Sequence, residues 1–197
     1  MEKLKNSFLQ QYFTNDAEIE LLYKFSGIKD DKRKSGIQFL EPTAGTGAII
    51  KYFYEREADR IEVKACEYDK ETRTHLKQVL TSMKLGEDTL YNEPNFLKLN
   101  TMQTFDYIIM NPPFNLGNGR KLSVEVFMDK VIELCGDIDI VLICPMGFRL
   151  NQTKKSKRLI KHKNIYPEIT SIIALPVDCF EETLFHAEVI LYNVSGV

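Results

Sequence analysis

Short apolar runs alternate along the chain with longer stretches in which apolar residues recur at helical spacing. The runs predict strands at residues 37–41, 61–66, 107–110, 137–144, 169–175 and 187–194. The helical spacing predicts helices between residues 15 and 27 and over 48–57, 70–85 and 124–134. Asn15, with Glu18 three residues later, is typical of a helix start. This alternation of strand and helix predicts an α/β fold.

The order of the elements predicts a mostly parallel sheet with helices on both faces. Residues 87–100 are irregular, with a short strand near Leu90 that brings the expected number of strands to seven. The connection at 176–186 is short for a parallel crossover and lacks a clear helix, so the last strand is expected to be antiparallel. Ligands bind outside the carboxyl ends of strands in such sheets, so residues there are candidates for the functional site.

The apolar run at 107–110 ends at the tetrapeptide Asn111-Pro112-Pro113-Phe114. Asn111 supplies an amide, the prolines fix the path of the chain, and Phe114 adds an aromatic face. Such a cluster can hold a flat ring that carries an amino group. The amide oxygen and a neighbouring backbone carbonyl would accept hydrogen bonds from the amino group, and the phenyl ring would stack. An ordinary Pro-Pro turn is the alternative interpretation.

A glycine-rich turn, Glu-Pro-Thr-Ala-Gly-Thr-Gly at residues 41–47, follows the first predicted strand. Glycines let the backbone approach a ligand closely. The third glycine of the dinucleotide fingerprint is replaced by Ile50, and no Gly-Lys-Ser/Thr follows as in a phosphate loop. Glu41 opens the turn, and its carboxylate would repel a pyrophosphate but suits a cationic ligand.

Glu67 directly follows the second predicted strand, twenty residues after Gly47. A carboxylate at that place in a strand–helix–strand unit is positioned to accept hydrogen bonds from ribose hydroxyls. A ribose combined with a cationic tail indicates S-adenosyl-L-methionine rather than NAD.

Together, the two motifs resemble those of the S-adenosylmethionine-dependent amino-methyltransferases, and most closely the N6-adenine-specific DNA methyltransferases. The resemblance covers nearly the whole chain. It implies a Rossmann-like methyltransferase fold in a single domain at 1–197, with 1–30 as a helical segment packed on the core. It also implies that residues 12–14 touch the methionine end of the cofactor and that Asn95-Phe96 replaces an Asp-Phe pair that binds its adenine. Asn95 departs from that pattern.

The site residues that the resemblance implies fall into two groups. The catalytic residues are Asn111, Pro112, Pro113 and Phe114. The cofactor-binding residues are Tyr12, Phe13, Thr14, Glu41, Pro42, Thr43, Ala44, Gly45, Gly47, Glu67, Tyr68, Asn95, Phe96 and Asn111. The implied reaction is methylation of the exocyclic N6 of adenine in DNA after the base has been flipped. Methylation of RNA adenine or of a protein glutamine amide remains open, as does an inactive cofactor-binding subunit of a larger modification complex.

The overall charge does not indicate a nucleic-acid-binding protein, because the 197 residues carry a net charge of −2. Basic residues are nevertheless concentrated at 149–163, after the strand predicted at 137–144, and in the loop at 115–121. The candidate nucleic-acid contacts are Arg120, Lys121, Arg149, Lys154, Lys155, Lys157 and Arg158. A solvated surface is the alternative interpretation of this basic stretch.

The sequence shows no sign of a membrane span, a signal peptide or a cysteine-based metal site. No apolar run approaches the ~20 residues needed to span a membrane, and the start lacks the apolar segment of a signal peptide. The four cysteines form no metal-binding pattern. We therefore expect a cytoplasmic protein without a metal site. The resemblance, and not the composition, implies that it acts on DNA and belongs to restriction-modification. Because the chain stops after its last strand, we expect a specificity subunit, a homodimer partner or a further C-terminal region to select the target sequence.

Overall fold

The computed structural model describes residues 14–100, 104–114, 122–149, 158–177 and 186–194. Within them, six strands form one mixed sheet: β1 (Ile37–Glu41), β2 (Ile61–Ala65), β3 (Tyr107–Met110), β4 (Asp139–Pro145), β5 (Ile169–Ala174) and β6 (Ala187–Tyr192). The α-helices are α1 (Asp16–Phe25), α2 (Ala48–Glu57), α3 (Lys70–Ser82), α4 (Ser123–Cys135) and α5 (Arg158–Asn164). Three short 3-10 turns complete the elements: η1 (Ile28–Asp30), η2 (Glu87–Thr89) and η3 (Phe96–Lys98).

The strands lie in the order β2-β1-β3-β4-β6-β5. β1 pairs in parallel with both β2 and β3, and β3 pairs in parallel with β4. β6 is antiparallel to both of its neighbours, β4 and β5, which confirms the prediction for the last strand. The chain runs from β1 outward to β2 and then returns to β3 on the other side of β1. The strand order therefore reverses between β1 and β3, and such a switch point is where sheets of this kind bind ligands.

The prediction of seven strands is wrong, because the stretch near Leu90 forms only an isolated bridge to Ala65. The backbone nitrogen of Tyr91 donates to the Ala65 carbonyl oxygen at 3.0 Å. The 3-10 turn η2 ends immediately before this bridge, and Pro94, which lacks a backbone donor, follows it. Too few extended residues remain between them to continue a ladder.

Two helices also differ from the sequence prediction. α3 ends at Ser82 rather than near residue 85, because Lys84 adopts a positive φ of 59° and reverses the chain. α5 was not predicted, because its seven residues are too few for a helical pattern to stand out within the basic stretch. By contrast, α2 has the predicted bounds.

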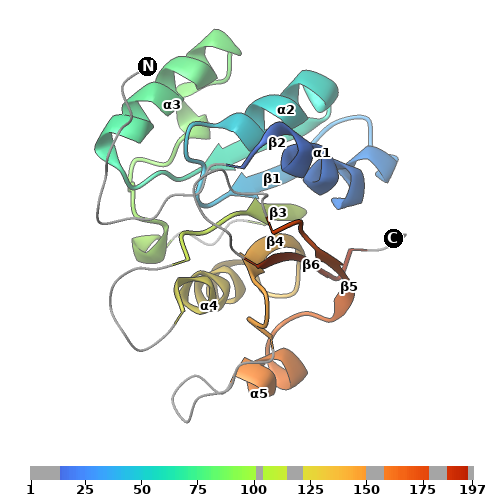
Figure 1. Ribbon diagram of the computed structural model, residues 1–197. Helices are drawn as coiled ribbons and strands as arrows, with labels where there is room; N and C mark the ends of the chain where they lie inside the picture. The colour runs from blue at the N-terminus through green and yellow to red at the C-terminus, as the bar shows by residue number, and fades with distance from the viewer. Residues whose placement is uncertain (1–13, 101–103, 115–121, 150–157, 178–185, 195–197) are drawn as a thin grey trace.

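Helices cover the strands from both sides (Figure 1). α1 and α2 lie beside each other on one side of the strands, and α4 lies on the other. α1 begins with the predicted capping box, in which Asn15 and Glu18 exchange side-chain to backbone hydrogen bonds. The Tyr23 ring of α1 packs edge-on against Phe53 of α2, with 5.2 Å between ring centroids. No helix in the described part of the chain is long and apolar enough to cross a membrane.

Candidate active site

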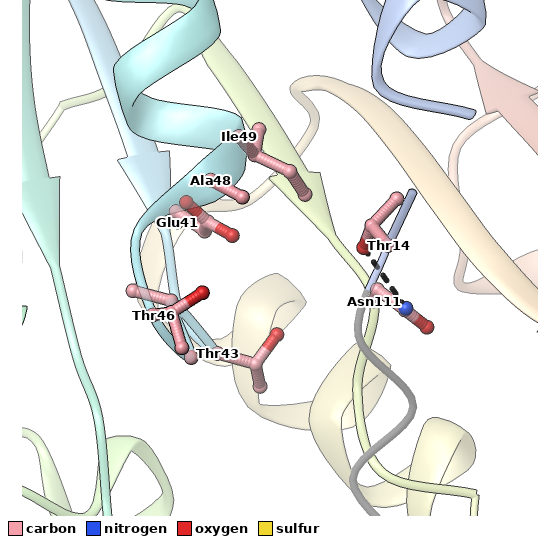
Figure 2. A pocket seen from close by; sticks show the side chains of 9 residues that line it. Thr14, Glu41, Thr43, Thr46, Ala48, Ile49 and Asn111 are labelled. Carbon is pink, nitrogen blue, oxygen red and sulfur yellow. Dashed lines mark hydrogen bonds between the residues drawn. The ribbon is translucent and has the colours of Figure 1, made fainter. Parts of the chain in front are cut away.

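A pocket lies at the switch point, between the carboxyl ends of β1 and β3 (Figure 2). It is lined by Thr14, Glu41, Thr43, Ala44, Gly45, Thr46, Ala48, Ile49 and Asn111. In the close-up, the side chains of Glu41 and Thr43 point from the glycine-rich loop toward the space between that loop and the pair Thr14–Asn111. The fold thus brings both sequence motifs to one pocket, as their places at strand ends predicted.

The glycine-rich loop has a backbone that requires glycine. Gly45 and Gly47 have φ values of 54° and 84°, a region that other residues rarely adopt. A Cβ atom on Gly47 would also come within 2.7 Å of Leu76 Cδ1 on α3. Since Gly47 is the N-cap of α2, these constraints fix where α2 starts and turn its first residues, Ala48 and Ile49, toward the pocket. Thr46, Ala48 and Ile49 were not among the predicted site residues, although they lie directly in or after the motif.

Glu41 is the most unusual side chain of the pocket. It is only 2% exposed, and its Oε2 atom has no hydrogen-bond partner among the described residues. Burial, and next the charge of Glu67, raise the pKa of the Glu41 carboxyl well above its ordinary value. A buried carboxylate oxygen without a partner is unfavourable unless a ligand supplies a donor or a positive charge. Thr43 Oγ1, in the same lining, is likewise a buried polar atom without a described partner.

Glu67, which follows the end of β2, holds the glycine-rich loop through hydrogen bonds. Its carboxylate accepts hydrogen bonds from the backbone nitrogens of Gly45 at 2.8 Å and Asp69 at 2.7 Å. Burial raises the pKa of the Glu67 carboxyl. The next residue, Tyr68, is 62% exposed and offers its ring at the surface. Glu67 thus has a structural role in holding the loop.

Asn111 follows β3 directly and faces the loop across the pocket. Its Nδ2 atom donates a hydrogen bond to Thr14 Oγ1 at 3.1 Å. Pro112 is buried and Pro113 is half-buried. Phe114 is only 6% exposed, so in this conformation it offers little ring surface on which a base could stack.

Asn95 and Phe96 have their own structural roles. The Asn95 side chain caps η3 by accepting from the Leu97 backbone nitrogen at 3.0 Å. Phe96 is 2% exposed and stacks on Phe127 of α4, with 5.9 Å between ring centroids. Neither residue lines the pocket described above, and the prediction that they bind the adenine of a cofactor gains no direct support from their placement.

Three of the described basic residues at 149 and 158–163 are drawn inward or paired with carboxylates. Arg158 is 3% exposed and burial lowers its pKa, which corrects the expectation that it contacts nucleic acid. Lys161 is turned inward, where its Nζ atom pairs with Glu125 Oε1 at 2.8 Å and Asp129 Oδ2 at 2.6 Å. Arg149 Nε lies 3.8 Å from Glu188 Oε1. Glu125 and Asp129, four residues apart on α4, are the sequence signal that could have placed Lys161 inside.

Several predicted residues lie outside the described part of the chain. They are Tyr12, Phe13, Arg120, Lys121, Lys154, Lys155 and Lys157. Within the described part, no group of three or more His, Cys, Asp or Glu side chains is placed to hold a metal ion.

The fold matches solved methyltransferases, although no known protein family and no curated protein matches the sequence. The methyltransferase subunit of a type I restriction-modification system from Streptococcus thermophilus is 16% identical, with a TM-score of 0.74 over 94% of this chain and 45% of that one. A modification subunit assigned to a type I restriction enzyme of Vibrio vulnificus is 15% identical, with a TM-score of 0.72 over 94% and 45%. A Listeria monocytogenes protein assigned to the class I S-adenosylmethionine-dependent methyltransferases is 16% identical, with a TM-score of 0.71 over 94% and 62%.

The chain therefore has the Rossmann-like fold of the S-adenosylmethionine-dependent methyltransferases. Type I restriction-modification subunits are among the proteins that share it. The chain spans less than half the length of those two subunits.

Proposed function

We propose that the protein is a methyltransferase that binds S-adenosylmethionine in the pocket between the glycine-rich loop and Asn111. The observation that carries the proposal is the buried carboxyl group of Glu41, a residue that lines the pocket and whose Oε2 atom has no hydrogen-bond partner among the described residues. A cationic ligand would supply that partner. When bound, S-adenosylmethionine supplies an electrophilic methyl group on a sulfonium. The assignment of the structurally similar Listeria monocytogenes protein to the S-adenosylmethionine-dependent methyltransferases supports the same cofactor.

The proposed acceptor is the exocyclic N6 of adenine in DNA. The lone pair of that amine is delocalised into the base, so its attack needs help. Hydrogen bonds from the amine to the Asn111 side-chain oxygen and the Pro112 carbonyl would favour a more nucleophilic nitrogen and align its lone pair. This role requires no basic side chain in the motif. A base inside a duplex cannot enter such a pocket, so it would have to be flipped or single-stranded.

Transfer of labelled methyl groups by the purified chain tests the proposal. DNA, RNA and a glutamine-containing polypeptide are offered in parallel, and the methylated product is identified. We expect N6-methyladenine in DNA. N6-methyladenine formed only in RNA, or label in the polypeptide, would support the other substrates that the motif allows. Cofactor binding without transfer to any of the three would favour a supporting subunit.

Replacing Glu67 with alanine is expected to weaken S-adenosylmethionine binding by about 1.5–3 kcal/mol, the usual range for a hydrogen bond to a charged group. The variant loses a carboxylate suited to ribose and also the acceptor that holds the Gly45 backbone nitrogen. Isothermal titration calorimetry measures the affinity. Glu62→Ala, at an exposed position of β2, the strand that precedes Glu67, is the matched control. Unchanged affinity in Glu67→Ala would remove Glu67 from the site.

The lysines at 154, 155 and 157 are proposed to contact phosphates. Replacing Lys154, Lys155 and Lys157 with glutamine should reduce the slope of log K against log salt by about 0.9 for each lysine that contacts a phosphate. Arg158 is left out because it is buried. Fluorescence anisotropy of a labelled duplex over a range of salt concentrations measures the slope.

Three exposed lysines before β1 provide the matched control for this charge change. They are Lys29, Lys32 and Lys34, near the amino end of the strand and away from the pocket. Replacing them with glutamine removes the same charge but should leave the slope closer to that of the unmodified protein. Equal slopes in the two triple variants would show that binding depends on net charge and not on a site at 154–157.

A further inference from the structure

Thr14 holds the Asn111 side chain, although the two residues are 97 positions apart in the sequence. The Asn111 Nδ2 atom donates to Thr14 Oγ1 at 3.1 Å, and both residues line the pocket. The amide oxygen lies on the far side of the Asn111 amide from Thr14 (Figure 2). The two ends of an amide are similar in shape but opposite in hydrogen-bonding character, one accepting and the other donating. In this structure Thr14 Oγ1 is the acceptor, so the amide nitrogen of Asn111 is turned toward Thr14 and the amide oxygen away from it.

The position of Thr14 is set by the start of α1. The Asn15 backbone nitrogen donates to Glu18 Oε2, and the Glu18 backbone nitrogen donates to Asn15 Oδ1, each at 3.0 Å. These two hydrogen bonds fix the residue next to Thr14. The helix is itself fixed on α2 through the Tyr23 ring, which packs against Phe53, and the Tyr23 hydroxyl, which donates to Glu57. Thr14 is thus placed by contacts outside the pocket, as a positioning group requires.

We propose that Thr14 is a positioning residue for the reaction, which keeps the oxygen of the Asn111 amide as the end presented to the amino group of the substrate. The inference rests on the proposed function in one respect, that Asn111 accepts a hydrogen bond from that amino group. An amide turned by half a rotation would present its own N–H donors to the donors of the substrate. Such a complex lacks the hydrogen bond that orients the lone pair, and it would transfer methyl groups slowly.

Variants of Thr14 separate the hydroxyl from the shape of the side chain. Thr14→Val keeps the branched shape and removes the hydroxyl, and it should lower the single-turnover rate by about five- to tenfold, the loss expected for one hydrogen bond of ordinary strength. Thr14→Ser keeps the hydroxyl and should restore the rate to within about twofold of the unmodified protein. Equal losses in the two variants would overturn the proposal.

Repeating Thr14→Val in a protein that already carries Asn111→Asp distinguishes a positioning role of Thr14 from direct contact between Thr14 and the cofactor. Asp at position 111 has two equivalent acceptor oxygens, so no orientation of the group needs to be chosen. In Asn111→Asp protein, Thr14→Val should therefore change the rate by less than about twofold. If Thr14 acted by touching the cofactor, the same fold-loss would appear in both backgrounds, and cofactor affinity would fall with it. That result would contradict the positioning role.

A measurement without turnover tests the contact itself. In nitrogen-labelled protein, the side-chain amide of Asn111 gives a nuclear magnetic resonance signal whose hydrogens exchange with water. Thr14→Val should shift that signal and accelerate the exchange, and Thr14→Ser should do neither. Thr74→Val, which removes a hydroxyl bonded to the Lys70 carbonyl on α3, is the control.

The two kinds of failure can be told apart. Absence of methyl transfer by the unmodified protein on every substrate would refute the proposed function, while the amide signal would still decide whether Thr14 orients Asn111. An Asn111 signal and exchange rate that do not respond to Thr14→Val would refute the positioning role, whatever the activity.

Discussion

Asn111→Ala is expected to lower the single-turnover rate of methyl transfer by about 10²–10³-fold, the usual effect of removing an oriented polar group that acts on the transition state. The variant removes the amide that faces the glycine-rich loop and leaves the buried strand β3 before it unchanged. Glu41 and the loop remain in place, so S-adenosylmethionine should still bind. Rapid-quench kinetics with saturating cofactor and DNA measures the rate, and calorimetry measures cofactor affinity.

Asn92→Ala is a matched control for this variant, because Asn92 is an exposed asparagine outside the pocket. It should transfer methyl groups at the rate of the unmodified protein. A near-normal single-turnover rate in Asn111→Ala would refute the catalytic role of Asn111. Loss of cofactor binding together with the rate would instead assign Asn111 to the cofactor site.

S-adenosylmethionine affinity is expected to rise with pH, and Glu41→Gln is expected to remove most of that rise. In the ligand-free protein, burial and the charge of Glu67 raise the pKa of Glu41, so the carboxyl keeps its proton above the pH at which an ordinary Glu ionises. A cation beside the carboxylate favours the ionised form and lowers that pKa in the complex. The complex then holds fewer protons than the free protein. By linkage, the affinity for S-adenosylmethionine increases with pH between the pKa of Glu41 in the complex and its higher pKa in the free protein. Above the higher of these two pKa values the affinity is constant.

Calorimetry in two buffers of different ionisation enthalpy counts the protons released on binding. Glu41→Gln is neutral at every pH and should bind S-adenosylmethionine about 10- to 100-fold more weakly at high pH, where the carboxylate would be ionised. Any proton release that persists in this variant measures the share of Glu67, whose pKa is also raised by burial. Asp139→Asn is the control, because burial raises the pKa of Asp139 to about 6 at the opposite end of the sheet, on β4. No proton release from the unmodified protein would contradict the role given to Glu41.

The elements predicted most accurately from sequence are those whose pattern is local. α2 follows a glycine that begins it, and its predicted and observed bounds agree. The capping box of α1 is a contact between residues three apart, so it could be recognised directly. The short connection between the last two strands correctly indicated an antiparallel pair, because chain length limits which crossovers are possible.

The meeting of the glycine-rich loop and Asn111 could also be predicted, since the carboxyl ends of parallel strands lie at one edge of a sheet. The sequence could not determine which side chains at that edge would be exposed to a ligand. Phe96 and Phe114 have aromatic rings that could stack on the adenine of a cofactor or on a substrate base, yet both side chains are buried in the described structure. Asn95 carries a suitable amide, yet it caps η3.

The sequence by itself determined the elements, their alternation and the two motifs, because periodicity, glycine and proline act over a few neighbouring residues. The tertiary structure decided the place of β6 between β4 and β5, the inward turn of Arg158 and Lys161, and the contact between Thr14 and Asn111. Each of these depends on residues that are distant in the chain and meet only when helices pack on the sheet. A local sequence pattern does not predict contacts between residues that are distant in the chain. The free energy that favours one set of such contacts comes from burial and pairing across the whole domain.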